Sequence, residues 1–481
     1  MTYSTNEVVK MTKLLLIFSF ISFYSISQEG PLKKPLLWKG DSKQTKDTTS
    51  LLYAFKNGEI DGRIRYYSSL SINDGNLTDF YANALGAGLR YETGIFHGFQ
   101  IAMSGFATFN IASSDLSIPD PITNRVSRYE LGLFDVANPG QTKNLAQNEE
   151  LYLKYNFKKL QLIFGRQFLH TPLLNLQDGR MRPTTVEGLW YGYAPNKKWK
   201  FEGGWLYRIF PRSTNKWYRI DESMGLYPQG RNTSGQPANY LGNLSSNGLG
   251  IFSVNYKPIK GIDIQVWDYY LDNIINSAFI QVKGKAKIKE KFSLLYGGQF
   301  MRQDAINDGG NSNPDLSYTE RGAKSMTFGG TVGMQKKSWI FALNYNRITK
   351  HGKYLFPREW GRDPFFTFLP RERNEGFGDV HAVSAQVKYN PKENPFFASL
   401  GAGYYDLPDI LEQKELNKYA IPAYFQVNLD LKYKHQKWLK GLESHLLVVS
   451  KIAEGNAYDN PRFVFQKVNL LHVNLMLNYY F

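Results

Sequence analysis

The sequence contains no cysteine among its 481 residues. It therefore has neither a disulfide framework nor a thiolate metal site. Its seven histidines are scattered without metal-ligand spacing, so we expect no metal site and no cofactor. An acidic excess is also lacking, because 58 Lys and Arg residues outnumber 42 Asp and Glu residues, for a formal net charge of +16. An excess of basic residues favours anionic partners but does not determine the fold.

Long apolar runs are scarce as well. One candidate is "MTKLLLIFSFISFYSISQEG", which starts at Met11 and holds an apolar run from Leu14 to Tyr24 before the small residues of "SIS". These features are typical of a secretory signal peptide over residues 1–27, with Met11 as an alternative start. A membrane anchor fits less well because the run is short for a span. The mean hydropathy of −0.41 also argues against a helical membrane protein.

The last segment, "VNLLHVNLMLNYYF", alternates apolar and polar residues. Because successive side chains of a strand point to opposite faces, this alternation places one set on each face. The apolar set is Leu471, Val473, Leu475, Leu477, Tyr479 and Phe481, and the mostly polar set is His472, Asn474, Met476 and Asn478. A strand of a soluble sandwich can look the same, so the fold depends on whether the pattern recurs.

The alternation does recur along most of the chain. Residues 423–435 set Phe425, Val427, Leu429, Leu431 and Tyr433 against Gln426, Asn428, Asp430, Lys432 and Lys434. Residues 277–288 set Ile280, Val282, Ala286 and Ile288 against Gln281, Lys283, Lys285 and Lys287. A face rich in Lys and Asn must meet water, while the other face is apolar. Strands that separate two solvents are typical of a transmembrane β-barrel.

The pattern predicts an all-β fold, a transmembrane antiparallel β-barrel of about eighteen strands. We expect these strands near residues 59–69, 79–93, 99–110, 149–157, 160–169, 188–195, 199–209, 250–258, 262–273, 277–288, 291–303, 325–335, 339–349, 379–391, 396–408, 423–435, 442–454 and 467–481. No linker or shift of composition divides this region. The barrel is therefore expected over residues 59–481, after a periplasmic segment over residues 28–58.

The connections between these strands support the barrel. Every second connection is short, for example "KK" at 158–159 and "KEK" at 289–291. Most of the others are long, near residues 111–148, 170–187, 210–249, 304–324, 350–378 and 409–422. Outer-membrane barrels have short turns on the periplasmic rim and loops on the other, whereas a β-sandwich has no reason to keep this parity. The bacterial outer membrane is the expected location.

A barrel of this width cannot be filled by its own wall side chains, so we expect a water-filled lumen and a pore. Roughly thirty residues between the signal and the first strand are too few for the plug domain of larger barrels. Loops folded into the lumen are then the expected way to narrow it.

Three stretches resemble the OprD family of outer-membrane porins: "GRQFLHTPLLNLQDGRMRPTTVEGL" at 165–189, "FYANALGAGLRYETG" at 80–94 and "WGRDPFFTFLPRE" at 360–372. The first of them is the most specific. The resemblance implies an eighteen-stranded barrel whose third and seventh loops fold inward as constrictions. It also implies a lining of basic side chains that guides small carboxylate-bearing nutrients. The aromatic end, Phe481, likewise resembles the strand signature that the barrel-assembly machinery recognises.

Candidate pore residues come from two arguments. The resemblance places Asp178, Arg180 and Arg182 in the third loop, and Arg358, Arg362, Arg371 and Arg373 in or near the seventh. Strand parity directs eight more to the lumen: Arg63, Arg65, Lys154, Lys283, Lys285, Lys388, Lys432 and Lys434. Fixed cations in a narrow passage concentrate anions, and Arg can grip a carboxylate with two hydrogen bonds. The plainer alternative is that these residues are solvated side chains, or that loop cations contact lipopolysaccharide.

Two expectations concern the lipid face. Alternation from Leu160 to Phe164 would turn Arg166 toward lipid, so this strand should bulge or end early. Aromatic residues near strand ends should form interfacial girdles. They are Trp190, Tyr191, Trp199, Trp205, Trp267, Trp339, Tyr404 and Trp438.

The sequence thus predicts a passive outer-membrane porin for small polar or anionic solutes, and not an enzyme. An oligosaccharide-uptake porin is the alternative within transport, since aromatic side chains suit sugars. A barrel lipase is the less favoured alternative, because neither His445 near Ser444 and Ser450 nor His381 near Ser384 makes a recognisable motif. An adhesin, which would bind its target through the long loops, is a third alternative function. Expected partners are the solutes, outer-membrane lipid and lipopolysaccharide, and the assembly machinery, with no nucleic acid; a monomer or loose trimer is expected.

Overall fold

The computed structural model describes residues 37–39, 47–143, 145–177, 179–232, 234–391 and 394–481. The predicted signal peptide, the alternative start at Met11 and the candidate Asp178 lie outside the described residues. In the part of the chain that is described, no helix is long and apolar enough to cross a membrane.

Eighteen strands form the wall of the molecule. They are β2 (Glu59–Ile72), β3 (Phe80–Glu92), β5 (Phe99–Ser113), β6 (Leu145–Phe157), β7 (Leu160–Gln167), β8 (Thr185–Tyr193), β9 (Trp199–Phe210), β11 (Leu249–Tyr256), β12 (Ile262–Leu271), β13 (Ile275–Lys289), β14 (Phe292–Ala305), β15 (Lys324–Lys336), β16 (Trp339–Ile348), β17 (Val380–Tyr389), β18 (Phe396–Asp406), β19 (Tyr424–Lys434), β20 (Leu442–Ala453) and β21 (Leu470–Tyr480). Short elements flank them: β1 (Asp47–Thr48), α2 (Leu51–Lys56), β4 (Ile95–Phe96), η1 (Leu131–Leu133), β10 (Tyr218–Arg219), η2 (Asp221–Ser223), η3 (Pro314–Leu316), η4 (Lys437–Leu439) and α3 (Pro461–Val464).

The wall strands pair antiparallel in chain order and close into a ring. Closure occurs where β21 pairs with β2, with Tyr480 opposite Arg63 and Leu471 opposite Ile72. A closed ring leaves no wall strand with an unpaired edge, which a lipid environment requires. The predicted closed barrel of eighteen antiparallel strands is therefore confirmed.

The two faces of the wall differ as the alternation predicts. On β21, Leu475 and Tyr479 are exposed on the outer face, whereas His472 and Asn474 are buried inside. On β13, Ile280 is exposed outside and Gln281 is buried inside. The apolar outer band can meet hydrocarbon, while the inner face keeps the polar side chains.

Strands β6 and β8 begin earlier than the sequence pattern predicts. Opposite Ser104 and Gly105 of β5, β6 carries one extra residue, Glu149, and opposite Glu187 and Gly188 of β8, β9 carries one extra residue, Tyr207. The bulge in β6 breaks the alternation on which the predicted start of that strand depended. β8 itself has no extra residue, and its pairing with β9 continues as far as Thr185 opposite Phe210.

Arg166 remains on the outer face of β7, because its pairing with β6 and β8 proceeds without a shift in β7 itself. The expected bulge in this strand is wrong, although β7 does end earlier than predicted. The Arg166 Nε donates to the Glu187 carboxylate at 3.2 Å, and its guanidinium lies 4.8 Å from the Trp217 ring centre. A carboxylate and an indole thus offset the cost of an outward-facing charge.

The expected girdle is only partly correct. Trp205 and Tyr404 are exposed on the outer face, but Trp190 and Trp267 are buried inside the barrel. Position near a strand end does not decide the face; alternation does, and each buried Trp has an exposed apolar neighbour in the chain.

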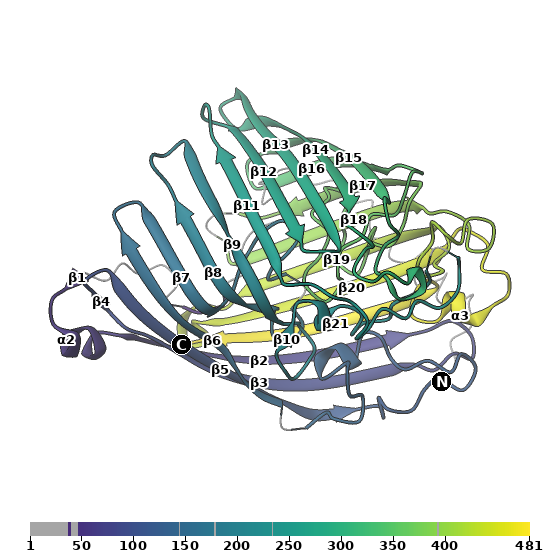
Figure 1. Ribbon diagram of the computed structural model, residues 1–481, viewed down its shortest axis with the longest axis horizontal. Coiled ribbons are helices and arrows are strands. Elements are labelled where there is room, and N and C mark those ends of the chain that lie inside the picture. The colour runs from purple at the N-terminus through teal and green to yellow at the C-terminus, as the bar shows by residue number, and fades with distance from the viewer. Residues whose placement is uncertain (1–36, 40–46, 144, 178, 233, 392–393) are drawn as a thin grey trace.

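Short turns and long loops gather at opposite ends of the barrel (Figure 1). The short turns lie at the upper left of the view, and the long loops at the lower right, while the carboxy terminus lies at the same end as α2. Several loops fold inward, so that loop residues such as Leu173, Met224 and Phe365 are fully buried among wall residues. One end of the lumen is therefore packed with loops, and open space remains toward the other.

Candidate functional site

A cavity of about 1730 Å³ lies inside the barrel. Its lining runs from the described part of the third loop (residues 168–177 and 179–184) and the seventh loop (residues 349–379) to short turns, at residues 390–391, 394–395 and 435–441. The cavity therefore begins where the inward-folded loops end.

The seventh loop is fastened to the inside of the wall by amide side chains. From β14, the Gln299 side chain donates to the Pro364 carbonyl at 2.8 Å. From β19, Gln426 and Asn428 donate to the Pro370 carbonyl at 2.9 and 2.8 Å. Because an extended loop cannot satisfy all its own carbonyl groups, inward-facing amides of the wall supply the donors. This explains why polar residues occupy that face opposite the loop.

The third loop is joined to the seventh. The Asn175 side chain donates to the Arg362 carbonyl at 3.0 Å, and the Thr184 hydroxyl donates to the Glu359 carbonyl at 2.9 Å. The two loops therefore form one layer across the lumen, as the family resemblance implied.

A cluster of charges is buried in this layer. The Arg358 Nε and the Lys418 Nζ each lie 3.8 Å from the Glu375 carboxylate, which also accepts from the Tyr419 hydroxyl at 2.8 Å. Burial raises the pKa of the Glu375 carboxyl, and the two cations oppose that shift. Arg358 is thus occupied inside the loop layer and does not line the large cavity.

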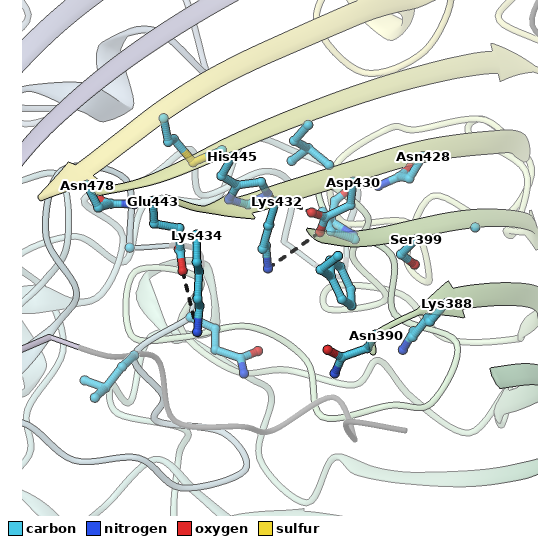
Figure 2. Close-up of a pocket in the computed structure, with 18 of the residues that line it drawn as sticks. Lys388, Asn390, Ser399, Asn428, Asp430, Lys432, Lys434, Glu443, His445 and Asn478 are labelled. Carbon is cyan, nitrogen blue, oxygen red and sulfur yellow. Dashed lines mark hydrogen bonds and ion pairs between the residues drawn. The ribbon is translucent and has the colours of Figure 1, made fainter. Parts of the chain in front are cut away.

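Strands β17 to β20 present basic side chains to the cavity (Figure 2). Lys388 on β17 and Lys432 and Lys434 on β19 point into the shared space, with β18 between the two strands. The Lys432 Nζ lies 4.0 Å from Asp430, and the Lys434 Nζ lies 3.9 Å from Glu443. At these distances each ammonium keeps most of its donors for water or solute.

His445, which the sequence offered as a candidate in a lipase, faces the same cavity. Its Nε2 lies 2.8 Å from the Asp430 carboxylate, while Ser444 bonds His435 instead at 2.9 Å. On the outer face, the Tyr345 hydroxyl bonds His381 at 2.8 Å, but Ser384 is buried on the inside. Neither candidate pair of serine and histidine is assembled.

Strands β2, β3 and β6 form an opposite kind of wall, in which charges of both signs are paired. Arg63 donates to both carboxylate oxygens of Glu149 at 2.8 Å. Arg90 lies 3.5 Å from Glu150 and 2.7 Å from Glu92, which also pairs with Lys154. The sequence analysis missed these acidic residues because the bulge in β6, at Glu149, breaks the alternation that would show which face they occupy. Two adjacent Glu residues in one strand were nevertheless a signal.

The predicted pore residues divide by position. Those that line the cavity are Arg63, Arg65, Arg180, Arg182, Lys283, Arg362, Arg371, Lys388, Lys432 and Lys434. Those outside its lining are Arg358, Arg373, Lys154 and Lys285. Two further lysines in a short turn, Lys437 and Lys440, also reach the cavity and were not predicted. They belong to a turn, where strand parity carries no information.

The described lining of the cavity is strongly basic. It contains twelve Lys and Arg side chains against two carboxylates, Asp430 and Glu443. Among the described residues, no group of three or more His, Asp or Glu side chains could hold a metal ion.

A closed barrel with an apolar outer band and a polar cavity defines the class of protein, a channel of the outer membrane. The family model for outer membrane porins of the OprD family matches residues 127–391, just over half of the chain. The chain therefore belongs to the OprD family. Members are non-enzymatic channels for small-solute uptake, so the assignment as a porin and not an enzyme is confirmed.

Solved structures of similar proteins have the same fold. OccK9 (OpdG) of Pseudomonas aeruginosa superposes with a TM-score of 0.69 at 13% identity, covering 89% of this chain and 99% of the other. OccAB3 of Acinetobacter baumannii gives 0.67 at 14%, covering 89% and 100%. OpdK of Pseudomonas aeruginosa, crystallised with vanillate, gives 0.65 at 13%, covering 89% and 99%. No curated protein matches by sequence.

Proposed function

We propose that this porin favours small solutes that carry carboxylate groups. The observation that carries the proposal is the imbalance of twelve basic against two acidic side chains in the described lining. Fixed cations raise the local concentration of anions in a confined passage and repel cations. No energy source is required, because the solute moves down its own gradient.

The wall formed by β17 to β20 is the part best suited to guide such solutes. Lys388, Lys432 and Lys434 follow one another toward the short-turn rim and stay accessible. A carboxylate can pass from one ammonium to the next, so each step replaces one ion pair with another. Arg180 and Arg362, from the two loops, would meet the solute at the inner end of this row.

An oligosaccharide path is less well supported. Such a path needs exposed aromatic faces. Phe366 and Phe368 in the lining are buried, and half-buried Phe397 has the Lys432 ammonium 5.1 Å from its ring centre. Lys283 lies 5.9 Å from the Phe366 ring centre, and the Arg362 guanidinium lies 4.4 Å from that of Phe368. Cations thus already lie against these aromatic rings, so the rings are not available to stack on a sugar. The arrangement favours anionic solutes over sugars.

The test is the reversal potential of single channels in a planar bilayer across a KCl gradient. We expect its sign to indicate preference for chloride. Swelling of liposomes with vanillate, a dicarboxylate, a cationic amino acid and a neutral oligosaccharide would then rank solutes. Faster swelling with the oligosaccharide or the cation than with the carboxylates would contradict the proposal.

The predicted partners in the membrane remain predictions. They are lipopolysaccharide at the loop rim, the barrel-assembly machinery, and a monomeric or loosely trimeric state. Native gels and cross-linking in detergent would measure the oligomeric state.

A further inference from the structure

Trp38, which precedes the barrel in the chain, lies inside the lumen. Its side chain is 1% exposed, and its indole Nε1 donates to the Glu150 carboxylate on β6 at 2.9 Å. The Arg63 guanidinium on β2 lies 4.6 Å from its ring centre. Both partners belong to inward-facing positions of the wall, so the indole is seated against the inside of the barrel.

The groups that contact this ring are themselves held in place. The Arg63 guanidinium lies between the rings of Trp38 and Phe106, 4.5 Å from the latter. Glu149 fixes the same guanidinium through two hydrogen bonds. On β3, the bare backbone of Gly88 admits the Phe106 ring, since a β-carbon there would lie 2.6 Å from it. The hydrogen bond to Glu150 and the cation–π contact with this fixed Arg63 define a specific position for Trp38.

The same segment contacts the third loop. Leu37, Trp38 and Leu176 form one buried apolar cluster, with Phe168 packed against it. Leu37 and Leu176 also line the large cavity. The segment therefore bridges the barrel wall and the third loop at the border of the open space.

We propose that Leu37 and Trp38 form a third constriction element, which fills the lumen beside β2, β3 and β6 and confines solutes to the rest of the lumen, on the side of β17 to β20. This inference goes beyond the proposed anion preference, because it concerns the width of the passage. The sequence led us to expect narrowing by loops alone.

The arrangement has a physical consequence for selectivity. Arg63 and Arg90, which face Trp38 and Glu150, are already neutralised by carboxylates. Removing the indole would therefore widen the passage along a wall whose charges are paired. The preference for anions, which depends on the other wall, should change little.

The experiment compares the full chain with Trp38→Ala in planar bilayers. We expect Trp38→Ala to raise single-channel conductance roughly twofold and to admit bulkier carboxylates, with a reversal potential close to that of the unmodified protein. The matched control is Trp438→Ala, because Trp438 is 87% exposed in a short turn and should leave conductance unchanged. Unchanged conductance and size limit in Trp38→Ala would overturn the proposal.

A second variant distinguishes an effect on channel width from a failure to fold. Trp38→Phe keeps an aromatic ring near Arg63 but loses the hydrogen bond to Glu150, so we expect conductance between those of the unmodified protein and Trp38→Ala. Heat-modifiable migration on gels reports whether each barrel is closed. If conductance were the same in both folded variants as in the unmodified protein, the element would not limit width. A channel without anion preference would refute the proposed function and leave this inference standing.

Discussion

The two walls of the lumen are both basic in sequence, yet they differ in the state of their charges. On β2, β3 and β6, the Arg63 and Glu149 side chains are 7% and 0% exposed and directly bonded. On β19 and β20, Lys434 and Glu443 are 73% and 25% exposed and lie 3.9 Å apart. Cations on the first wall act as structural partners, whereas the Lys434 ammonium on the second is largely exposed and can meet a solute.

A count of lumen-facing cations therefore overstates the charge that a solute meets. A buried cation with a bonded carboxylate presents almost no net field. An exposed ammonium contributes little to the free energy of unfolding, but it contributes fully to the local electrostatic potential. Stability and selectivity are thus carried by different walls.

The largest effect is expected from breaking the buried pair. Glu149→Ala leaves the Arg63 guanidinium without its carboxylate, which should cost about 3–5 kcal/mol of unfolding free energy. Glu443→Ala is the matched control on the other wall and should cost about 0–1 kcal/mol. Urea titration of the barrel in detergent, followed by tryptophan fluorescence, measures both. Equal losses would remove the distinction between the walls.

Next in size is the loss of the three lysines on β17 and β19. Replacing Lys388, Lys432 and Lys434 together with Gln should lower the ratio of anion to cation permeability roughly tenfold, because the fixed charge along the path is removed. The ratio is read from the reversal potential in a KCl gradient. The control, Lys154→Gln with Glu92→Gln, removes a pair on the other wall without changing net charge and should leave the ratio unaltered. If the permeability ratio fell in the control variant alone, the charges on β3 and β6 would be the ones that select anions.

A smaller change is expected at the third loop. Arg182 donates to the Thr214 carbonyl at 2.8 Å and its guanidinium lies 3.6 Å from the Phe210 ring centre, so part of its role is structural. Arg180→Gln with Arg182→Gln should reduce anion preference roughly twofold. Arg302→Gln, at an exposed position, is the control. An unchanged reversal potential would exclude both loop arginines from the selective passage.

The smallest effect is that of salt on the unmodified channel. Raising the mean salt concentration from about 0.1 to about 1 M shortens the screening length from about 10 to about 3 Å. The exposed lysines should then be screened, and anion preference should fall moderately at a constant concentration ratio. Preference that does not depend on salt would point to buried cations as its source.

Much of the fold could be predicted because its main signal is local. Alternation along β13, β19 and β21 identifies a strand, its apolar face and its polar face from the residues themselves. Connection length likewise identified the rim on which each loop lies. The inward face of Lys388, Lys432 and Lys434 needed nothing more than this period of two.

The rest depended on contacts between distant residues. Local alternation failed at the bulge in β6, so Glu149 could not be placed near Arg63 from the sequence. The pairing of these two residues follows from strand register in the closed ring, since 86 positions separate them.

The strands, their two faces and the basic lumen thus follow from the amino-acid sequence, because the period of two of a strand is visible within a few residues. Which cations are neutralised, how the loops cross the lumen, and the position of Trp38 inside it depend on the folded chain. Ring closure and inward folding bring those groups together across the barrel, and no local pattern records such distances.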